Sequence, residues 1–456
     1  MKSLTFEQVV HATGGSLVRP GQGEVSGVSI DSRKVQPGEL FIAIKGERFD
    51  GHSFLGEVAK AGAAGVVVSK AEELPESGAV ILVKDTRRAL GDLARLYRST
   101  LPVRVLAVTG SNGKTTTREM IGHILSHRFR VVKAEGSFNN DIGVPLTVFR
   151  LEPSTEVGVF EIEMNELGGT ARLAQVCGPE VGVVTNIGDS HLESMKDRAG
   201  VAREKAELLE ALPENGCAVL NADDPLVMGI GAKYAGCRKL TFGVEQRADV
   251  FATDVRELGL EGIEFTLQGE FPVRLPSPGR FQVANCLAAA AACSALGMEL
   301  RHIAGGIEGF EPPSMRLAIR KFPNLTLIDD CYNANPQSMR EAIRLLCANT
   351  RPEHRVAVLG DMLELGEHSV QAHTELGQWV AGCVDRVAFV GREVAHAVAV
   401  AVQAGRKPGR MRLYESSELL LPDLFDIVRR GDTLLVKGSR AMHLELVTRA
   451  ITEHYD

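Results

Sequence analysis

The chain has 456 residues, 44% hydrophobic and 24% charged; this length predicts about three domains, and this composition excludes a disordered or fibrous protein. Its 51 basic and 58 acidic residues give a formal net charge of -7, and it has one Trp and five Tyr. A negative chain with few aromatic side chains lacks the charge and the stacking surfaces typical of nucleic-acid-binding proteins. Any anion must therefore be held by a local site.

The eight cysteines are scattered, with no CxxC pair and no neighbouring histidine cluster. This spacing predicts reduced thiols and favours neither a disulfide framework nor a zinc site. No stretch of the sequence reaches the length of a membrane span, and MKSLTFEQVVHATGG lacks the apolar core of a signal peptide. We therefore expect a cytoplasmic protein without a membrane-inserted segment.

Residues 1–99 mix short strands and helices. The run ELFIAIKG at 39–46 predicts a strand, and FLGEVAKAGAAGVVVS at 54–69 predicts a helix that leads into a buried strand. This first stretch is expected to form a small α/β domain.

Residues 100–312 show a more regular pattern. Four apolar runs, each followed by turn residues or a helical pattern, predict a mostly parallel sheet; they are VRVLAVTG, EVGVFEIE, EVGVVTNIG and GCAVLNADD. Short segments between 248 and 276, separated by Gly and charged residues, predict antiparallel hairpins before an Ala-rich helix at 281–296. Pro312-Pro313 would then form a hinge.

Residues 313–456 return to alternating strands and helices. The runs LTLIDD, RVAVLGD, RVAFVG and TLLVKGS predict a second open α/β sheet. In such sheets ligands bind at the carboxyl ends of the strands, so the residues after each run are the first candidates for a site.

The strongest functional motif follows the run VRVLAV and begins a helical segment. It consists of Thr109, Gly110, Ser111, Asn112, Gly113, Lys114, Thr115 and Thr116. Backbone N–H groups at a helix N-terminus, an ammonium group and a hydroxyl for Mg²⁺ suit a triphosphate. The motif departs from the full phosphate-loop pattern, because Val108 stands where that pattern has its first Gly. The alternative is a glycine turn that caps a helix.

Four further side chains are candidates in the central stretch. Glu161 and Glu163 lie on one face of a strand, where one carboxylate could hold Mg²⁺ opposite Thr115 or both could be solvated. His191 follows another strand, either as a ligand or as a turn residue. Lys205 taken alone reads as a surface lysine beside Glu204 and Glu207.

In the last stretch, Asp329 and Asp330 end a strand and lead into Cys331-Tyr332-Asn333-Ala334-Asn335-Pro336. These groups could contact a ribose or a peptide, or they could simply form a turn before a helix that starts at Pro336. Gly360-Asp361-Met362 and Lys437-Gly438-Ser439-Arg440 lie at equivalent strand ends. The latter turn could bind anionic groups.

Over nearly its whole length the sequence resembles the Mur ligases of bacterial peptidoglycan synthesis, and among them the branch that adds D-alanyl-D-alanine. The motifs that carry this resemblance are TGSNGKTT, NNDIGVPLT, LNADDP, DDCYNANPQSM, VLGDMLELG and LVKGSRAM. The sequence departs from the family pattern at Phe281-Gln282 and at Met164-Asn165. The resemblance implies three α/β domains: a UDP-substrate domain at 1–99, a central P-loop ATP domain at 100–312, and a Rossmann-like ligase domain at 313–456.

The resemblance also implies roles for particular residues. Thr115, Glu161, His191 and a carbamylated Lys205 would hold two Mg²⁺ ions, with Lys114 on the phosphates. The remaining nucleotide contacts would come from Asn285, Arg316 and Asp330. The substrate contacts would be Ser32, Arg33, Lys45, Asn139, Asn140, Tyr332, Asn333, Asn335 and Lys437.

The implied reaction is an ATP-dependent amide ligation. The carboxylate of UDP-N-acetylmuramoyl-tripeptide would be phosphorylated to an acyl phosphate, and D-alanyl-D-alanine would attack it to give the pentapeptide. Closure about Pro312-Pro313 would bring Arg316 onto the phosphates, in a monomeric enzyme. The alternatives are a sibling ligase with another acceptor and a non-catalytic ATP-binding switch.

Overall fold

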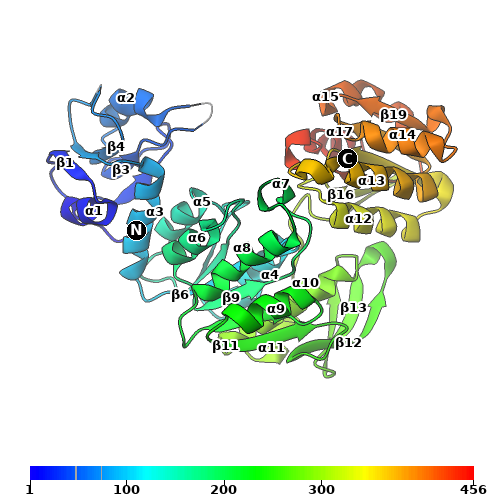
Figure 1. The fold of residues 1–456 in the computed structure, drawn as a ribbon, viewed down its shortest axis with the longest axis horizontal. Helices are drawn as coiled ribbons and strands as arrows, with labels where there is room; N and C mark the ends of the chain where they lie inside the picture. The colour runs from blue at the N-terminus through cyan, green and yellow to red at the C-terminus, as the bar shows by residue number, and fades with distance from the viewer. Residues whose placement is uncertain (47–48, 73, 456) are drawn as a thin grey trace.

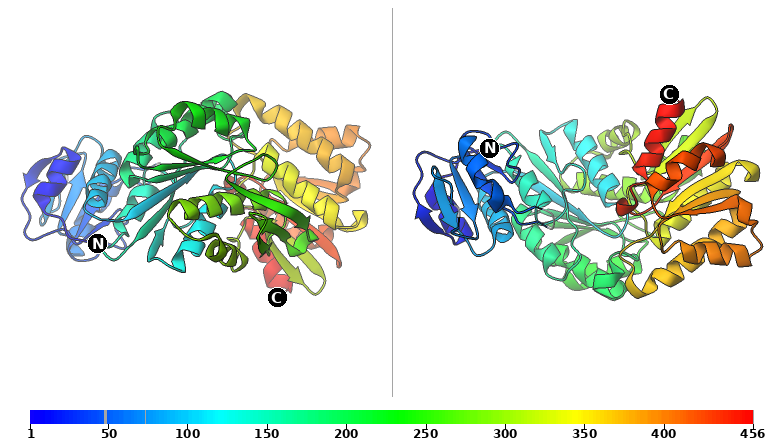
Figure 2. Two further views of the ribbon diagram at one scale, coloured as in Figure 1. Left: turned by 90° about the horizontal axis from the view of Figure 1, so that it is seen from below. Right: turned by 90° about the horizontal axis from the view of Figure 1, so that it is seen from above.

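The computed structural model describes residues 1–46, 49–72 and 74–455. Three separate sheets follow one another along the chain. Figure 1 shows the first and the last at opposite ends of the molecule, with the central sheet between them. The two further views in Figure 2 keep this elongated arrangement. The expected three-part α/β architecture is confirmed.

The first sheet has five strands in the order β1-β5-β4-β3-β2, with β1 antiparallel to β5 and the other pairs parallel. The strand predicted over 39–46 ends at Ile42, after which Lys45 forms an isolated bridge with Asp50. The elements are α1 (Phe6–Thr13), β1 (Ser16–Arg19), β2 (Gly27–Ser29), β3 (Glu39–Ile42), α2 (Leu55–Lys60), β4 (Gly65–Val68), β5 (Ala79–Leu82) and α3 (Thr86–Ser99).

Helix α3 links the first sheet to the central one. Asp85 caps it by accepting hydrogen bonds from the backbone N–H groups of Arg87 and Arg88. The helix packs against α1 and also against α5 (Gly143–Phe149) and α6 (Gly169–Cys177), which belong to the central part of the chain. One buried apolar cluster therefore runs from the first sheet to Val105 and Phe160 of the central sheet. Burial of this shared cluster holds the two parts together.

The central sheet has nine strands in the order β14-β13-β12-β11-β10-β9-β6-β8-β7. The strands from β7 to β12 are parallel, whereas β12, β13 and β14 pair antiparallel, which confirms the hairpins predicted at 248–276. The strands are β6 (Arg104–Thr109), β7 (Val131–Lys133), β8 (Val157–Glu161), β9 (Val181–Val184), β10 (Cys217–Asn221), β11 (Arg238–Gly243), β12 (Val250–Glu257), β13 (Ile263–Leu267) and β14 (Phe271–Leu275).

Helices cover the central sheet on both faces. The Ala-rich helix α10 is buried against α4 and the neighbouring strands, because its small side chains allow close approach. The helices are α4 (Lys114–Ser126), α5 (Gly143–Phe149), α6 (Gly169–Cys177), α7 (Leu192–Met195), α8 (Arg198–Glu210), α9 (Pro225–Tyr234), α10 (Phe281–Ala295) and α11 (Leu300–Glu308).

The last sheet has six strands in the order β15-β16-β20-β17-β18-β19, all parallel except the β15-β16 pair. Its elements are β15 (Ala318–Phe322), β16 (Leu325–Asp330), α12 (Pro336–Asn349), β17 (Arg355–Gly360), α13 (Ser369–Cys383), β18 (Arg386–Val390), α14 (Ala395–Gln403), β19 (Met411–Tyr414), α15 (Ser417–Leu420), α16 (Leu424–Ile427), β20 (Asp432–Lys437) and α17 (Glu445–Tyr455). None of the helices in the described part of the chain is long and apolar enough to cross a membrane.

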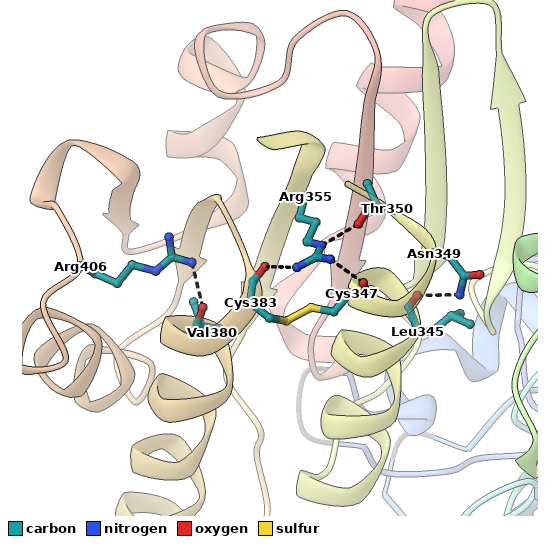
Figure 3. Close-up of a disulfide and its surroundings, with 8 residues drawn as sticks. All are labelled: Leu345, Cys347, Asn349, Thr350, Arg355, Val380, Cys383 and Arg406. Atoms are coloured by element: carbon teal, nitrogen blue, oxygen red, sulfur yellow. Dashed lines mark hydrogen bonds between the residues drawn. A yellow bond between two sulfur atoms is a disulfide. The ribbon is translucent and has the colours of Figure 1, made fainter. Parts of the chain in front are cut away.

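The prediction that all cysteines are reduced is wrong in one place. Cys347, near the end of α12, forms a disulfide with Cys383, the last residue of α13 (Figure 3). Their Cα atoms lie 6.1 Å apart, within the range that a disulfide spans. The side chain of Arg355 donates hydrogen bonds to the carbonyls of both cysteines, at 2.7 Å to Cys347 and 3.2 Å to Cys383. Packing of α12 against α13 brings the two thiols together, which the spacing of the cysteines along the chain does not reveal.

Candidate nucleotide and ligase site

The phosphate-loop motif joins β6 to α4, as predicted. Gly110 and Gly113 have φ values of 138° and 81°, which side-chain-bearing residues rarely adopt. A Cβ atom would meet Thr185 at Gly110 and Asn285 at Gly113. The Thr185 hydroxyl donates to the carbonyl of Asn112 at 2.6 Å and so anchors the loop to β9. The motif is therefore a loop of defined conformation at the N-terminus of a helix, where backbone N–H groups bind anions favourably.

The side chain of Lys114 folds back over this loop. Its Nζ donates to the carbonyls of Gly110 at 2.7 Å and Ser111 at 3.3 Å, and forms a 2.6 Å ion pair with Glu163. Burial raises the pKa of Glu163, but the positive charges of Lys114 and His191 outweigh it and hold that pKa well below its usual range. An ionised Glu163 therefore balances the cations of the site.

Thr115 and Glu161 form a second contact at the start of α4. The Thr115 hydroxyl donates to Glu161 at 2.8 Å, and the Asn139 amide donates to Glu161 at 3.0 Å and to Glu163 at 3.1 Å. Arg118 lies 3.4 Å from Glu161. The described residues contain no group of three His, Cys, Asp or Glu side chains able to hold a metal by themselves. A hydroxyl and a carboxylate nevertheless fit Mg²⁺, which usually takes one or two carboxylates and completes its shell with water and substrate phosphates.

His191 lies between two carboxylates, one on each ring nitrogen. Its Nε2 is 3.1 Å from Glu163 and its Nδ1 is 2.5 Å from Glu364, off the ideal hydrogen-bond direction on that side. Burial lowers the pKa of His191, but contact with these carboxylates outweighs it and raises the pKa to about 9. His191 has the left-handed φ of 52°. The simple turn-residue interpretation is therefore insufficient.

Lys205 is not a surface residue. Its side chain in α8 is fully buried and forms a 2.7 Å ion pair with Glu204, although its Nζ has no well-aligned hydrogen-bond acceptor. Glu207, on the same helix, accepts hydrogen bonds from the backbone N–H groups of Gly168 and Ala171 at the start of α6. The charge of Lys205 also lowers the pKa of Glu163, so Lys205 lies within electrostatic reach of the phosphate-loop network.

The strand ends of the last sheet bring several predicted residues together. Lys437 is buried, and its Nζ contacts Asp330 at 2.6 Å and the carbonyl of Asn333 at 3.0 Å. Asn335 donates to Asn112 at 2.8 Å, which joins this cluster directly to the phosphate loop. The turn at the end of β16 is thus both a helix cap and an interdomain contact.

Arg316 and Tyr332 lie against each other. The Arg316 guanidinium stacks over the Tyr332 ring at 4.0 Å from its centroid. None of the hydrogen bonds or ion pairs that residues 109–116 form within the described part of the chain involves Arg316. The expected phosphate contact of Arg316 stays a prediction.

The remaining predicted residues lie in three places. Asn285 lies against Gly113 and donates to Gln282 at 2.8 Å. Asn140 accepts the Gly143 N–H at 2.9 Å at the start of α5. Ser32 and Arg33 lie between β2 and β3, and Lys45 follows β3. Figure 1 shows the sheet that contains β3 and β4 at the opposite end of the molecule from the last sheet. Arg33 pairs with Asp31 at 2.8 Å and is largely exposed.

The structure adds Glu364 and Gln337 to this network and decides the position of Glu163, which the sequence offered as one of two candidate carboxylates. Glu163 was one of two carboxylates on the same strand face, and only the folded structure shows it between Lys114 and His191. Glu364 and Gln337 come from the last sheet, and Gln337 accepts from Asn112 at 3.1 Å. Glu364 lies within the motif VLGDMLELG, but that motif does not reveal its partner, because His191 is 173 positions away in the chain.

Comparisons with known proteins agree with this arrangement. Residues 24–98 match the Mur ligase family catalytic domain, 108–293 the Mur ligase middle domain, and 315–440 the glutamate ligase domain of Mur ligases. The chain is 37% identical to a UDP-N-acetylmuramoyl-tripeptide–D-alanyl-D-alanine ligase of Bacillus subtilis, over 99% of each protein.

Two solved structures are also similar. A MurF from Acinetobacter baumannii superposes with a TM-score of 0.90 at 33% identity, over 99% of both chains. A MurF ligase from Thermotoga maritima, solved in complex with ADP, superposes with a TM-score of 0.81 at 28% identity, over 94% of this chain and 97% of that one. With a phosphate loop at its centre and three matching domains in the same order, the chain belongs to the Mur ligase family.

Proposed function

We propose that this chain is an ATP-dependent ligase that joins D-alanyl-D-alanine to UDP-N-acetylmuramoyl-tripeptide and releases ADP and phosphate. The observation that carries the proposal is the joining of the phosphate loop to the strand ends of the last sheet through Asn112, Asn335 and Gln337. A site shared in this way can hold a nucleotide and an acceptor side by side. The relatives whose names state this reaction match the chain over its full length.

The reaction brings two anionic groups together, the tripeptide carboxylate and the γ-phosphate of ATP. The tripeptide carboxylate attacks the γ-phosphorus, the bond to the β-phosphate oxygen breaks, and an acyl phosphate and ADP result. The dipeptide amine, after losing a proton, then attacks the acyl carbon and expels phosphate. Lys114 moves from Glu163 and the loop carbonyls onto the phosphates and neutralises their charge, while backbone N–H groups of the loop orient them.

The metal assignments belong to this proposal. Thr115 and Glu161 would hold one Mg²⁺, and His191 with a carbamylated Lys205 would hold a second. Bound Mg²⁺ would offset the negative charge that develops between carboxylate and phosphate. Lys205 is buried, and its Nζ has the Glu204 carboxylate at 2.7 Å but no well-aligned hydrogen-bond acceptor, which supports a modified side chain.

The nucleotide and substrate contacts follow the same order along the molecule. Asn285 beside Gly113 would contact adenine, Asp330 would act with Lys437 near the ribose, and Arg316 would reach the phosphates after closure about Pro312-Pro313. The UDP-linked substrate would run from the first sheet past the central site. Its contacts would be Ser32, Arg33, Lys45, Asn139 and Asn140, and the acceptor contacts would be Tyr332, Asn333, Asn335 and Lys437.

The proposal includes domains at 1–99, 100–312 and 313–456, acting in a monomer. Because ATP and a UDP-linked substrate are both consumed, we place the reaction in the cytoplasm.

The test is ATP-dependent phosphate release with UDP-N-acetylmuramoyl-tripeptide, read together with the product mass. D-alanyl-D-alanine is compared with D-alanine, with meso-diaminopimelate and with no acceptor. Turnover only with the dipeptide, and the mass of a pentapeptide, is the expected result. Turnover with another acceptor would assign the chain to a sibling reaction, and ATP binding without any product would overturn the ligase proposal.

A further inference from the structure

Glu364 belongs to the last domain, and its contacts connect that domain to the central one. It follows β17 in a loop that lies against the short helix α7, at the place where Figure 1 shows the central and last parts of the molecule approaching each other. Its carbonyl accepts the backbone N–H of Glu193 at 3.1 Å, and its carboxylate lies 2.5 Å from Nδ1 of His191. A third contact, His368 Nε2 to the Lys196 carbonyl at 3.3 Å, reinforces this junction.

Three residues with strained backbone lie at this junction. Glu364, His191 and Lys196 have φ values of 63°, 52° and 71°, and none of them is glycine. Left-handed backbone at such residues costs free energy and persists only where surrounding contacts hold it. Strain on both sides of one contact indicates that the two loops are shaped to meet.

The ring of His191 is held at both nitrogens. Nε2 faces Glu163, which in turn pairs with Lys114, so this nitrogen points into the phosphate-loop network. Nδ1 faces Glu364, on the side away from that network. A carboxylate beside one ring nitrogen orients the ring, and in the neutral imidazole that a ligand requires it keeps the proton on that side, so that the other nitrogen faces the ligand.

We propose that Glu364 is a positioning residue: it holds the His191 imidazole with Nε2 toward the nucleotide site, and it does so only while the last domain is docked on the central one. This inference rests on the proposed role of His191 in the ligase reaction. It makes docking of the last domain a requirement for an ordered His191. ATP binding itself depends on the phosphate loop, and among the described residues Glu364 forms its ion pair with His191 and none with that loop.

Glu364→Gln tests the inference because it keeps the size and the backbone contact to Glu193 while removing the charge. The matched control is Glu367→Gln in the same loop, where the side chain is 88% exposed and lies 4.0 Å from His368. We expect Glu364→Gln to lower kcat roughly tenfold to 100-fold, as is usual when a group that orients a ligand histidine is removed. The KM for ATP should stay within about twofold, and the control should match the parent protein.

A double-mutant cycle with His191→Gln separates positioning from a general loss of stability. Adding Glu364→Gln to His191→Gln should lower kcat no further, and the shifts of the two single variants in urea unfolding midpoint should not add. A kcat for Glu364→Gln equal to that of the control, or losses that simply multiply, would overturn the inference.

The urea unfolding arm of this double-mutant cycle needs no substrate. If the parent chain formed no amide product, the proposed function would fail while this arm still decided the inference: non-additive midpoints would support the coupling of Glu364 to His191, and additive midpoints would overturn it.

Discussion

Asn335 Nδ2 lies 2.8 Å from Asn112 Oδ1, so the first turn of α12 touches the phosphate loop directly. The same Asn335 side chain caps α12 by accepting the N–H of Ser338 at 2.9 Å. One side chain therefore serves the stability of a helix and the contact between two domains.

Asn335→Asp should separate these two roles. Asp caps a helix as well as Asn does, but it places an acceptor against the Asn112 oxygen. We expect unchanged stability in urea and a lower turnover, whereas Asn335→Ala should in addition lose about 1 kcal/mol of stability. Equal turnover of Asn335→Asp and the parent would show that the contact with Asn112 is dispensable.

Lys114→Ala should lower turnover on the order of 100-fold or more, because one preorganised contact to the transferred phosphate is lost. Phosphate release measures this effect. Lys60→Ala, in the exposed last turn of α2, is the matched control. Near-normal turnover of Lys114→Ala would remove this lysine from the mechanism.

Lys205→Ala should lose activity and regain part of it when a short carboxylate such as acetate is added, since that ion can replace the carbamate oxygens. In the form of the protein in which Lys205 is unmodified, the change also leaves Glu204 buried without its ion-pair partner, so the stability of that form should fall by about 3–5 kcal/mol.

The double variant Lys205→Ala with Glu204→Gln removes that stray charge and should show the same rescue in a more stable protein. Full activity of either variant without carboxylate would contradict the carbamate assignment.

The burial of His373 predicts that the protein loses stability in mild acid. It is fully buried, its Nε2 accepts the Met362 N–H at 3.0 Å, and burial lowers its pKa. The charged groups around it are Asp361, Glu393 and His396. Because the pKa is lower in the folded than in the unfolded protein, the unfolded chain takes up the proton first as the pH falls. The stabilising effect of neutral His373 is therefore complete above the unfolded pKa of about 6.5 and is lost below it.

Urea unfolding of the parent and of His373→Gln between pH 7.5 and 5 measures this effect. The parent should lose up to about 1.4 kcal/mol per pH unit more than the variant just below pH 6.5. Identical pH profiles would show that His373 does not titrate differently on unfolding.

The Cys347–Cys383 disulfide should be found in the purified protein under non-reducing conditions. Alkylation of the unfolded, unreduced chain should then label six of its eight cysteines. Reduction, or Cys347→Ser with Cys383→Ser, should lower the free energy of unfolding by about 2–4 kcal/mol, since the bond closes a loop of 36 residues in the unfolded chain. Labelling of all eight cysteines without a reductant would show that the two thiols stay reduced.

The sequence alone predicted much of this protein. Apolar runs followed by turn residues or a helical pattern identified strands in all three sheets, and the short segments at 248–276 identified the antiparallel hairpins, because strand and turn patterns are local. The short or exposed strands β1, β2, β5, β7, β11, β15 and β19 were not identified in this way. The phosphate loop was equally predictable, since Gly110, Gly113 and Lys114 must be close in sequence to form it.

Only the tertiary structure decided how distant charges pair. The choice between Glu161 and Glu163 as the partner of Lys114, the burial of Lys205 and the disulfide between Cys347 and Cys383 all depend on which elements pack side by side. Glu364 is the clearest case, because its contact with His191 exists only when two domains meet. Local sequence patterns determine secondary structure and contiguous loops, whereas electrostatic partners are selected by packing between segments far apart in the chain.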